Sequence, residues 1–360
     1  MREAPLIERV AIKNFKSIAS CDVQLKPLTV LAGPNGSGKS NFLEALRFLS
    51  RALAVSLEDA VATHGGWDSV VRRGAGGIEF EVEGTWQDIS IRYGAYVHSS
   101  GVGFEECVVG HHFFRRHSPA EPEGSLDRFP TVGRSQFLLA KVGDTRPFGW
   151  AYRSLTQTHV YNPPASALRQ PSPATRYRFL LDGDARNLAE IVFHLQEEHP
   201  ELLARATEFL QVISPGVNPV RASRGGLSFY HLLFGEPPFE AKSMSDGTLR
   251  ALALLVALYQ VPGPTLIGIE EPEAGLHPAS AEVLIEAMRE ASSSVQVVAT
   301  THSPEMLDAL NLDEDRLLIA DRTDGQTRIG PIDEVGRDAL KKRLYSLGQL
   351  LRYEQLQPGV

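Results

Sequence analysis

The sequence predicts an α/β protein whose core is a parallel sheet covered by helices on both faces. Two short runs, "TLIGI" (265–269) and "SVQVVATTH" (294–302), are largely apolar without alternation, as expected of strands buried on both sides. The segment between them, "PASAEVLIEAMREA", has helical spacing, and so does the preceding "DGTLRALALLVALYQ". Apolar strands that alternate with helices are typical of a parallel sheet.

The chain opens with further strands and a helix. "LIERVAIKNF" alternates apolar and polar residues, and "CDVQLKPLTVLAG" ends in an apolar run that stops at Gly33. From Asn41 to about Ala60, the apolar residues Phe42, Leu46 and Leu49 recur on one helical face. Strand, glycine loop and helix therefore follow one another.

The middle of the chain is organised differently. Residues 77–110 alternate in short runs broken by Gly and Ser, which indicates an antiparallel meander, and residues 118–135 have the composition of an exposed loop. Residues 184–213 have helical spacing with a break at Pro200. We expect three parts: an N-terminal lobe with the glycine loop and the meander (1–155), a helical lobe (156–243) and a C-terminal lobe (244–360).

Composition limits the classes of function. The net charge is −8 over 360 residues, so no global basic field attracts nucleic acid. Cys21 and Cys107 offer neither a disulfide framework nor a metal-ligand pattern. No apolar run reaches the ~18 residues of a membrane span, and we expect a soluble, cytoplasmic protein with no membrane partner. "HHFFRRH" (111–117) and "KKR" (341–343) are interpreted as solvated or strand-face clusters, with a metal tract and a nucleic-acid patch as the alternatives.

The stretch "GPNGSGKS" (33–40) has the pattern G-x-x-x-x-G-K-S of a phosphate-binding loop. It follows an expected strand and opens an expected helix, which is the context that this pattern requires. The alternative is a glycine-rich turn with a solvated lysine. We expect nucleotide contacts from Gly33, Pro34, Asn35, Gly36, Ser37, Gly38, Lys39, Ser40 and Asn41.

The residue types in this loop have physical roles at their places. Gly33, Gly36 and Gly38 let the backbone take positive φ and point N–H groups at a phosphate beside the helix N-terminus. Lys39 adds a positive charge for the β- and γ-phosphates, and the hydroxyl of Ser40 can ligate Mg²⁺. The loop therefore predicts a nucleotide site with a magnesium ion.

Three carboxylates crowd the end of the strand 265–269, which is costly without a positive partner. Because ligands of a parallel sheet sit at the carboxyl ends of its strands, Glu270 can hold the metal together with Ser40. Glu271 is then placed to orient or deprotonate an attacking water, and Glu273 is left as a turn or interface residue. The alternative makes Glu270 and Glu271 the start of a surface loop.

Two polar stretches complete this group. "TTHSP" ends an apolar strand, so His302 can meet the γ-phosphate there, with a capping role as the alternative. In "MSDGT", Ser245, Asp246 and Gly247 stand at the start of an apolar helix. Ser245 or Asp246 as an N-cap is the plain explanation, and helix N-termini also bind anions.

Taken together, "IKNFKS", "GPNGSGKSN", "MSDGT", "IEEPEAGLHP" and "TTHSP", in their places along the chain, resemble the motifs of the ATP-binding-cassette (ABC) ATPases. Within that family they are similar to the RecF, SMC and OLD-like branch, and most to its stand-alone RecF-like ATPases. The resemblance covers about residues 6–60 and 240–305. It implies an ABC ATPase head with a RecA-like parallel core, an antiparallel β subdomain and a helical lobe.

The resemblance also assigns motif roles. "GPNGSGKS" corresponds to Walker A, "MSDGT" to the signature, "IEEPEAGLHP" to Walker B with the D-loop, and "TTHSP" carries the switch histidine. In that family two heads enclose two ATP molecules. The resemblance implies that Ser245 and Gly247 contact the γ-phosphate across a dimer interface, opposite Lys39, Glu271 and His302 of the other subunit. ATP binding then closes a homodimer, and hydrolysis opens it.

Some features depart from the family pattern or leave alternatives open. Asp246 stands where a glycine is usual, Thr248 where Gln or Glu is common, and Glu270 where an aspartate usually supports the metal, so slow turnover is expected. Gln136 and Gln157 are candidates for the glutamine loop, each with an ordinary surface glutamine as the alternative. The chain has no sustained heptads, so we expect a head without long coiled-coil arms.

These features predict an ATPase that converts ATP to ADP and phosphate, with ATP and Mg²⁺ as ligands. We expect an ATP-dependent homodimer that acts on DNA or on a nuclease, repair or defence protein. The alternative is the ATPase subunit of an ABC transporter. A small-molecule kinase with the same loop would leave "MSDGT" and His302 without a role.

Overall fold

The structure is a computed structural model that describes residues 6–170, 180–223, 226–231 and 239–359. Within these residues, one mixed sheet of 13 strands runs through the molecule and a second sheet has three strands. Helices cover both faces of the parallel part of the large sheet. The α/β class predicted from the sequence is confirmed.

Five strands of the large sheet run parallel to one another and form its core. Alternate residues of β3 (Leu28–Ala32) face opposite sides of the sheet. Val30 and Ala32 belong to one hydrophobic core, and Leu31 belongs to the other. A strand buried on both faces has to be apolar throughout, which is the pattern its sequence shows. In spatial order the five are β15 (Arg316–Thr323), β3 (Leu28–Ala32), β14 (Gln296–Thr301), β13 (Leu266–Glu270) and β9 (Thr158–Tyr161).

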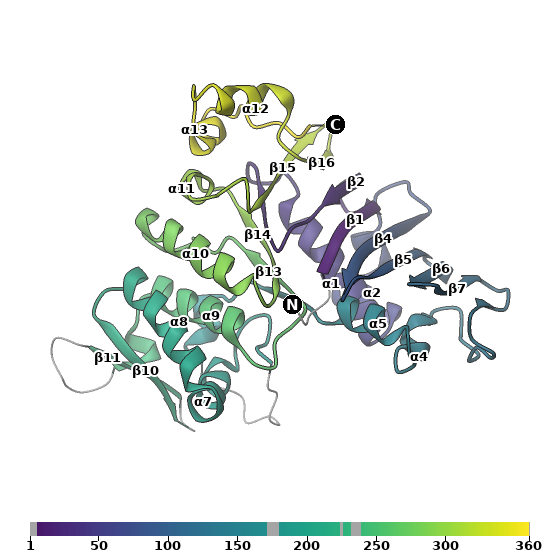
Figure 1. Ribbon diagram of the computed structural model, residues 1–360, viewed down its shortest axis with the longest axis horizontal. Helices are drawn as coiled ribbons and strands as arrows, with labels where there is room; N and C mark the ends of the chain where they lie inside the picture. The colour runs from purple at the N-terminus through teal and green to yellow at the C-terminus, as the bar shows by residue number, and fades with distance from the viewer. Residues whose placement is uncertain (1–5, 171–179, 224–225, 232–238, 360) are drawn as a thin grey trace.

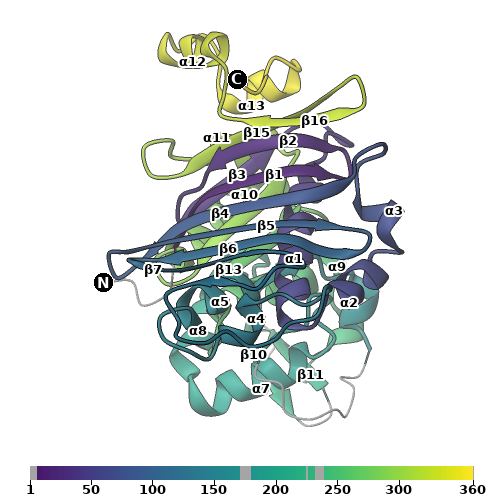
Figure 2. The same cartoon turned by 90° about the vertical axis from the view of Figure 1, so that its right-hand side faces the viewer.

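The other strands extend this sheet beyond β15, mostly with antiparallel pairing. In spatial order they are β16 (Gln326–Gly330), β2 (Ile18–Gln24), β1 (Leu6–Phe15), β4 (Gly77–Trp86), β5 (Ile89–His98), β6 (Gly101–Val109), β7 (His112–His117) and β8 (Glu123–Gly124). Figure 2 shows these strands following one another across the sheet. The antiparallel meander predicted for residues 77–110 is confirmed as β4 to β6.

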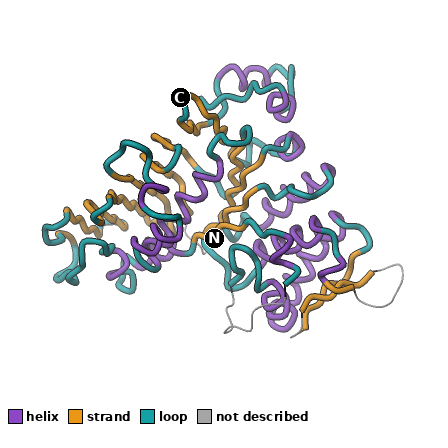
Figure 3. The backbone as a smooth tube through the Cα atoms, turned by 180° about the vertical axis from the view of Figure 1, so that it is seen from behind, coloured by secondary structure: helices purple, strands orange, loops and turns teal. Residues whose placement is uncertain are grey.

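The helices form two groups, one on each side of the large sheet, and bury their apolar residues in two separate hydrophobic cores, as Figure 3 shows from behind. One face carries α1 (Lys39–Ala54), α2 (Leu57–Thr63), α3 (Trp67–Val70), α4 (Leu139–Val142) and α5 (Gly149–Thr156). The other carries α6 (Ala165–Leu168), α7 (Leu188–Glu198), α8 (Pro200–Ile213), α9 (Asp246–Tyr259), α10 (Ala281–Ala291), α11 (Pro304–Asp308), α12 (Glu334–Lys341) and α13 (Leu347–Arg352). Two 3₁₀ turns, η1 (Ala241–Ser243) and η2 (Pro278–Ser280), precede α9 and α10.

The segment expected as a helical lobe, 156–243, contains more than helices. It begins with β9 in the large sheet, continues through α6 to α8, and ends in a small sheet of β10 (Val217–Ser223), β11 (Gly226–His231) and β12 (Phe239–Glu240). The predicted break at Pro200 is the start of α8, because the fixed φ of proline suits the first turn of a helix. In Figure 1 the helices and the small sheet lie on the opposite side of the parallel strands from β4 to β7.

Three smaller expectations also have outcomes. The last six residues of "HHFFRRH" form β7, and no group of three or more His, Cys, Asp or Glu side chains in the described segments could hold a metal. "KKR" lies exposed at the end of α12. No helix among the described residues is long and apolar enough to cross a bilayer.

Candidate active site

The candidate site lies where the carboxyl ends of β3, β14 and β13 meet at one edge of the sheet. In the strand register, Ala32 of β3 lies beside Thr301 of β14, and Thr300 of β14 lies beside Glu270 of β13. The glycine loop, the carboxylates and the "TTHSP" stretch are therefore neighbours. The sequence predicted this arrangement from the parallel sheet alone.

The glycine loop joins β3 to α1 with three glycines at positive φ. The φ values are 154° at Gly33, 78° at Gly36 and 100° at Gly38, where other residue types would be strained. Space is limiting as well, because a Cβ on Gly33 would lie 2.1 Å from the carbonyl oxygen of Ala320. Four residues of the loop are exposed at its mouth: Pro34, Asn35, Gly36 and Ser40.

Two features of this loop fit a bound phosphate. The ammonium of Lys39, only 5% exposed, donates to the carbonyls of Gly33 (2.8 Å) and Pro34 (2.9 Å), which leaves one of its three protons available. The hydroxyl of Ser37 is buried and has no hydrogen-bond partner within the described segments. The amide of Asn41 donates to Ser17 Oγ at 2.6 Å, so it is already used within the protein.

Glu270 occupies the place predicted for a metal-binding carboxylate. Its Oε2 accepts hydrogen bonds from Ser40 Oγ at 3.3 Å and from Asn162 Nδ2 at 3.1 Å. Burial raises the pKa of Glu270, and the negative charge of Glu44 adds to the rise. A carboxylate and a hydroxyl are hard oxygen donors of the kind that Mg²⁺ prefers, so Glu270 and Ser40 fit a magnesium ion.

Glu271 and His302 meet at the same edge. Glu271 Oε1 lies 3.2 Å from His302 Nδ1, and both side chains are partly exposed (39% and 44%). The backbone of Glu271 has a φ of 45°, and its N–H donates to the carbonyl of Thr300 at 3.0 Å. The turn thereby separates the directions of the two adjacent carboxylates, and Glu271 faces the histidine while Glu270 faces Ser40.

The third carboxylate, Glu273, bonds to the neighbouring strand. Its Oε1 accepts from Thr301 Oγ1 at 2.5 Å, while its Oε2 is buried without a partner in the described part of the chain. Burial lowers the pKa of Lys39, and the charges of Glu271 and Glu273 oppose that change. Glu273 therefore belongs to the electrostatic environment of the lysine, which the sequence did not indicate.

The start of α9 forms the turn that we call the signature turn (Ser245–Gly247). Ser245 is the N-cap of α9, and its Oγ accepts from the Thr248 backbone N–H at 3.1 Å. Asp246 pairs with Arg169 at 2.5 Å, and a Cβ on Gly247 would lie 2.2 Å from the carbonyl oxygen of Gly275. The capping interpretation of Ser245 is thus confirmed, and its contact with a nucleotide stays a prediction.

Arg250 and Asn162 are part of the site, although the sequence did not single them out. Arg250 Nη2 donates to the carbonyls of Glu270 (2.8 Å) and Glu271 (3.2 Å) and to Asn162 Oδ1 (3.1 Å). Burial lowers the pKa of Arg250, and the three nearby glutamates oppose this change. The available signals were a single charge in the apolar helix "LRALALLVALY" and a polar residue ending the run "THVYN".

Neither candidate for the glutamine loop lies at the site. Gln157 precedes β9, at the end of the strand opposite to Asn162. Gln136 accepts from the N–H of Gly133 at 3.1 Å in the segment after β8. The amide beside Glu270 belongs instead to Asn162, which follows the last residue of β9.

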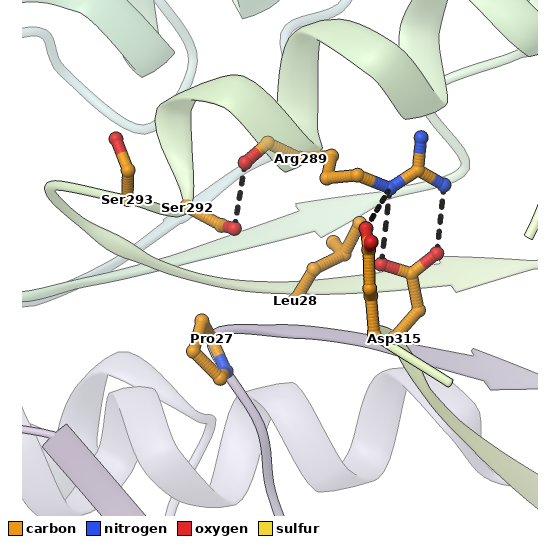
Figure 4. Close-up of a pocket in the computed structure, with 7 residues that line it drawn as sticks. Pro27, Leu28, Arg289, Ser292, Ser293 and Asp315 are labelled. Carbon is orange, nitrogen blue, oxygen red and sulfur yellow. Dashed lines mark hydrogen bonds and ion pairs between the residues drawn. The ribbon is translucent and has the colours of Figure 1, made fainter. Parts of the chain in front are cut away.

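A cavity of about 320 Å³ lies away from this edge, at the start of β3. Figure 4 shows Leu28 in it beside Arg289, whose guanidinium pairs with Asp315 at 2.8 Å. Arg289 also pairs with Glu286 at 2.8 Å. Because Leu28 and the glycine loop lie at opposite ends of β3, the cavity is separate from the candidate active site.

Two family models match parts of the chain. Residues 6–94 match the model described as an AAA ATPase domain. Residues 155–308 match the model described as an AAA domain, putative AbiEii toxin, Type IV TA system. The two matches include the glycine loop and the segment from β9 to α11.

The relatives found by sequence are DNA-related proteins. The chain is 34% identical over 155 residues to the DNA replication and repair protein RecF of Porphyromonas gingivalis, which covers 40% of this chain and 37% of that protein. It is 42% identical over 41 residues to the OLD nuclease of Thermus scotoductus, covering 11% and 8%. The chain therefore spans well under half of the curated relatives it matches. These relatives do not favour the transporter alternative.

Solved structures share the fold over nearly the whole chain. An SMC head bound to the C-terminal winged-helix domain of ScpA has a TM-score of 0.61 at 16% identity, and covers 94% of this chain and 100% of that one. An SMC head from Pyrococcus furiosus with an extended coiled coil has a TM-score of 0.58 at 14% identity, and covers 95% and 100%. The large mixed sheet with its helices is therefore the fold of an SMC head.

Proposed function

We propose that this chain, which belongs to the RecF/SMC/OLD-like P-loop ATPases, binds ATP with Mg²⁺, hydrolyses it and uses it to switch between a monomer and a closed homodimer. The observation that carries the proposal is the pairing of Ser40 with Glu270 beside Glu271 and His302. These residues come from three neighbouring strand ends, and a surface loop gives no reason for them to converge.

The glycine loop (33–40), called the phosphate loop from here on, supplies the binding groups. Lys39 has one ammonium proton left for a phosphate oxygen, and the three glycines let backbone N–H groups approach the ligand closely. The hydroxyl of Ser37, which has no partner in the part of the chain that the structure describes, offers one more hydrogen bond. Exposed residues Pro34, Asn35 and Gly36 leave the mouth of the loop open.

Ser40 and Glu270 would hold the magnesium ion, with Asn162 beside them. The ion would supply the positive charge that crowded carboxylates and phosphate oxygens need. Arg250 keeps Glu270 and Asn162 in place by binding the Glu270 carbonyl and the Asn162 side chain. This support explains why a charged side chain is retained in an otherwise apolar helix.

Glu271 is the proposed general base for hydrolysis. Its carboxylate can accept a proton from an attacking water, and His302 Nδ1 holds the same carboxylate at 3.2 Å. The two side chains are partly exposed, so water reaches them. The products are ADP and phosphate.

The second half of each composite site is proposed to come from a partner subunit. Ser245 and Gly247 stand at the N-terminus of the 14-residue helix α9, where backbone N–H groups and the helix dipole favour an anion. In the single chain this turn packs on Gly275 and does not bond to the phosphate loop through any described hydrogen bond. A dimer would give it a phosphate to bind.

Mixing two inactive variants tests the composite site. Lys39→Ala removes the phosphate contact of one subunit, and Ser245→Asp keeps the N-cap of α9 but places a negative charge against the phosphate. Each variant alone is expected to be inactive. In an equal mixture half of the dimers contain one chain of each variant, and each of these mixed dimers regains one intact site out of two. The mixture should therefore recover about a quarter of the wild-type ATPase rate. Activity of Ser245→Asp alone, or no recovery in the mixture, would contradict a shared site.

The proposed partner is DNA or a nuclease, repair or defence protein, and the proposed location is the cytoplasm. The RecF and OLD relatives support this choice, although the chain spans only part of them. ATPase rates should be measured with single-stranded and double-stranded DNA across a salt series. Stimulation that fades with salt would support DNA, whereas no binding at low salt would exclude it and leave the ATPase untouched.

A further inference from the structure

The phosphate loop is backed by a part of the chain that carries none of the sequence motifs. The hairpin of β15 and β16 lies directly behind it, and Thr327 of β16 is 1% exposed there. A Cβ on Gly38 would lie 2.0 Å from Thr327 Oγ1, and one on Gly33 would lie 2.1 Å from the Ala320 carbonyl oxygen. The hairpin therefore limits how closely the phosphate loop can approach β15 and β16.

A series of hydrogen bonds joins Thr327 to the loop, and the donor and the acceptor of each bond can be assigned. Thr327 Oγ1 lies 2.8 Å from the carbonyl oxygen of Ser37, which can only accept, so the threonine donates. Ser17 Oγ lies 2.7 Å from Thr327 Oγ1 and must donate to it, since the threonine proton is used. Asn41 Nδ2 donates in turn to Ser17 Oγ at 2.6 Å. A second bond, from the Thr327 backbone N–H to the Ser17 carbonyl at 2.9 Å, fixes the two residues together.

These hydrogen bonds fix the orientation of the peptide that joins Ser37 to Gly38. In a planar trans peptide the C=O and the following N–H point in opposite directions. When Thr327 holds the Ser37 carbonyl behind the loop, the N–H of Gly38 is directed to the opposite side. At φ of 100°, Gly38 has the freedom to rotate, so its orientation needs such an anchor.

We propose that Thr327 is a positioning residue of the nucleotide site: its hydroxyl fixes the Ser37–Gly38 peptide so that the Gly38 N–H faces the phosphates. This inference rests on the proposed ATP site. Ser17 completes the anchor by filling the acceptor side of the Thr327 hydroxyl. The C-terminal hairpin is then part of the nucleotide site, although it lies 290 residues from the loop in sequence.

Two substitutions of Thr327 separate the hydroxyl from the shape of the side chain. Thr327→Val keeps the branched shape and removes the hydroxyl, so the Ser37 carbonyl loses its donor. We expect the Kd for ATP to rise about tenfold, the effect of one buried hydrogen bond. Thr327→Ser keeps the hydroxyl and should bind ATP as the wild type does. The matched control is Thr323→Val on the same hairpin, because Thr323 is exposed and its hydroxyl bonds only to Asp321 in the described contacts.

Comparing two ligands shows whether the substitution acts on phosphate binding. Binding of ATP and of inorganic tripolyphosphate should be measured by calorimetry for each variant. Because the anchored N–H faces phosphate, Thr327→Val should weaken both ligands by the same factor. Equal affinities of Thr327→Val and Thr323→Val for both ligands would overturn the inference, and so would failure of Thr327→Ser to bind like the wild type.

The inference and the proposed function fail in different ways. If the wild-type chain binds neither ATP nor tripolyphosphate, the nucleotide site is wrong and the role of Thr327 is wrong with it. If the wild type binds and Thr327→Val binds equally well, only the role of Thr327 is wrong. Should Thr327→Val not fold, Ser17→Ala removes the donor to Thr327 and should weaken ATP about threefold. Unchanged binding by Ser17→Ala would then overturn the inference.

Discussion

The phosphate loop and the signature turn are both built at the N-terminus of a long helix, yet they differ in what they leave unused. The loop keeps a buried Ser37 hydroxyl that has no partner among the described residues, and a spare Lys39 proton. In the signature turn, Ser245 caps its own helix and Asp246 pairs with Arg169. One region is ready for a ligand within a single chain, and the other has its side chains engaged locally.

This difference separates the effects expected of mutations. Loop residues should control the affinity of the isolated chain for nucleotide. Signature-turn residues should control the stability of the isolated chain and, in a dimer, the turnover. Arg250 connects the two regions through Glu270. It lies on the helix that begins with the signature turn and binds the carbonyls of Glu270 and Glu271, and the Glu270 side chain accepts from Ser40 of the loop.

The largest expected effect is on the loop side. Lys39→Ala should weaken ATP binding by about 100-fold or more, because the loop loses its only mobile charge next to the phosphates. Calorimetric titration with ATP and Mg²⁺ measures this change. Lys342→Ala, an exposed lysine paired with Asp338, is the matched control and should bind like the wild type. If Lys39→Ala bound ATP within a fewfold of the wild type, the loop would not control the affinity for nucleotide.

The link between the regions should be costly to remove. Arg250→Met leaves the part-buried Glu270 carbonyl and the exposed Asn162 side chain without their donor, and should lower the free energy of unfolding by about 1–3 kcal/mol. Denaturant unfolding measures the loss. The exposed Arg322 offers a control, since Arg322→Met should change stability by less than about 0.5 kcal/mol. Equal effects of the two substitutions would contradict the role of Arg250.

Glu270→Gln should have two opposite effects. Burial raises the pKa of Glu270 in the folded chain, so its stabilising contribution is present below the unfolded pKa and is lost as pH rises through the folded pKa. At neutral pH the charged carboxylate therefore costs stability, and the variant without nucleotide should be more stable than the wild type. Melting curves recorded at several pH values between about pH 4 and pH 8 should show the advantage of the variant growing with pH.

The same variant should bind Mg²⁺ and ATP more weakly, since it lacks the metal-binding carboxylate. Glu44→Gln removes the neighbouring charge and keeps Glu270, which makes it the control for electrostatics alone. If Glu270→Gln were less stable than the wild type at neutral pH and bound Mg²⁺ with ATP normally, the assignment of Glu270 to the metal would be wrong.

The smallest effect is expected at the signature turn. Ser245→Ala removes the N-cap and should lower the free energy of unfolding by about 1 kcal/mol, while Ser245→Asp keeps the cap and should be nearly neutral. Neither should change the ATP affinity of the isolated chain by more than about twofold. Thermal unfolding and calorimetry provide the two readouts. A large loss of ATP affinity in the monomer would place Ser245 in the nucleotide site of its own chain.

Local sequence patterns were sufficient for the strands β3, β13 and β14, the glycine loop and the pairing of Ser40 with Glu270. Each of these follows from a short motif together with the rule that parallel strands end at one edge. Asn162, Arg250 and Thr327 were not found, because their roles come from contacts between distant segments. Asn162 lies 108 residues from Glu270, and Thr327 lies 290 residues from Ser37. No local pattern records such a contact.

The central claim is that ATP joins the phosphate loop of one chain to the signature turn of another. Glu271→Gln should bind ATP but not hydrolyse it, so it should hold the closed state long enough to measure. Light scattering of this variant after gel filtration, with ATP and Mg²⁺, is the direct measurement, and the double variant Lys39→Ala/Glu271→Gln is its control. The account predicts the mass of two chains with ATP and of one chain in the control. A mass of one chain for Glu271→Gln with bound ATP would contradict it.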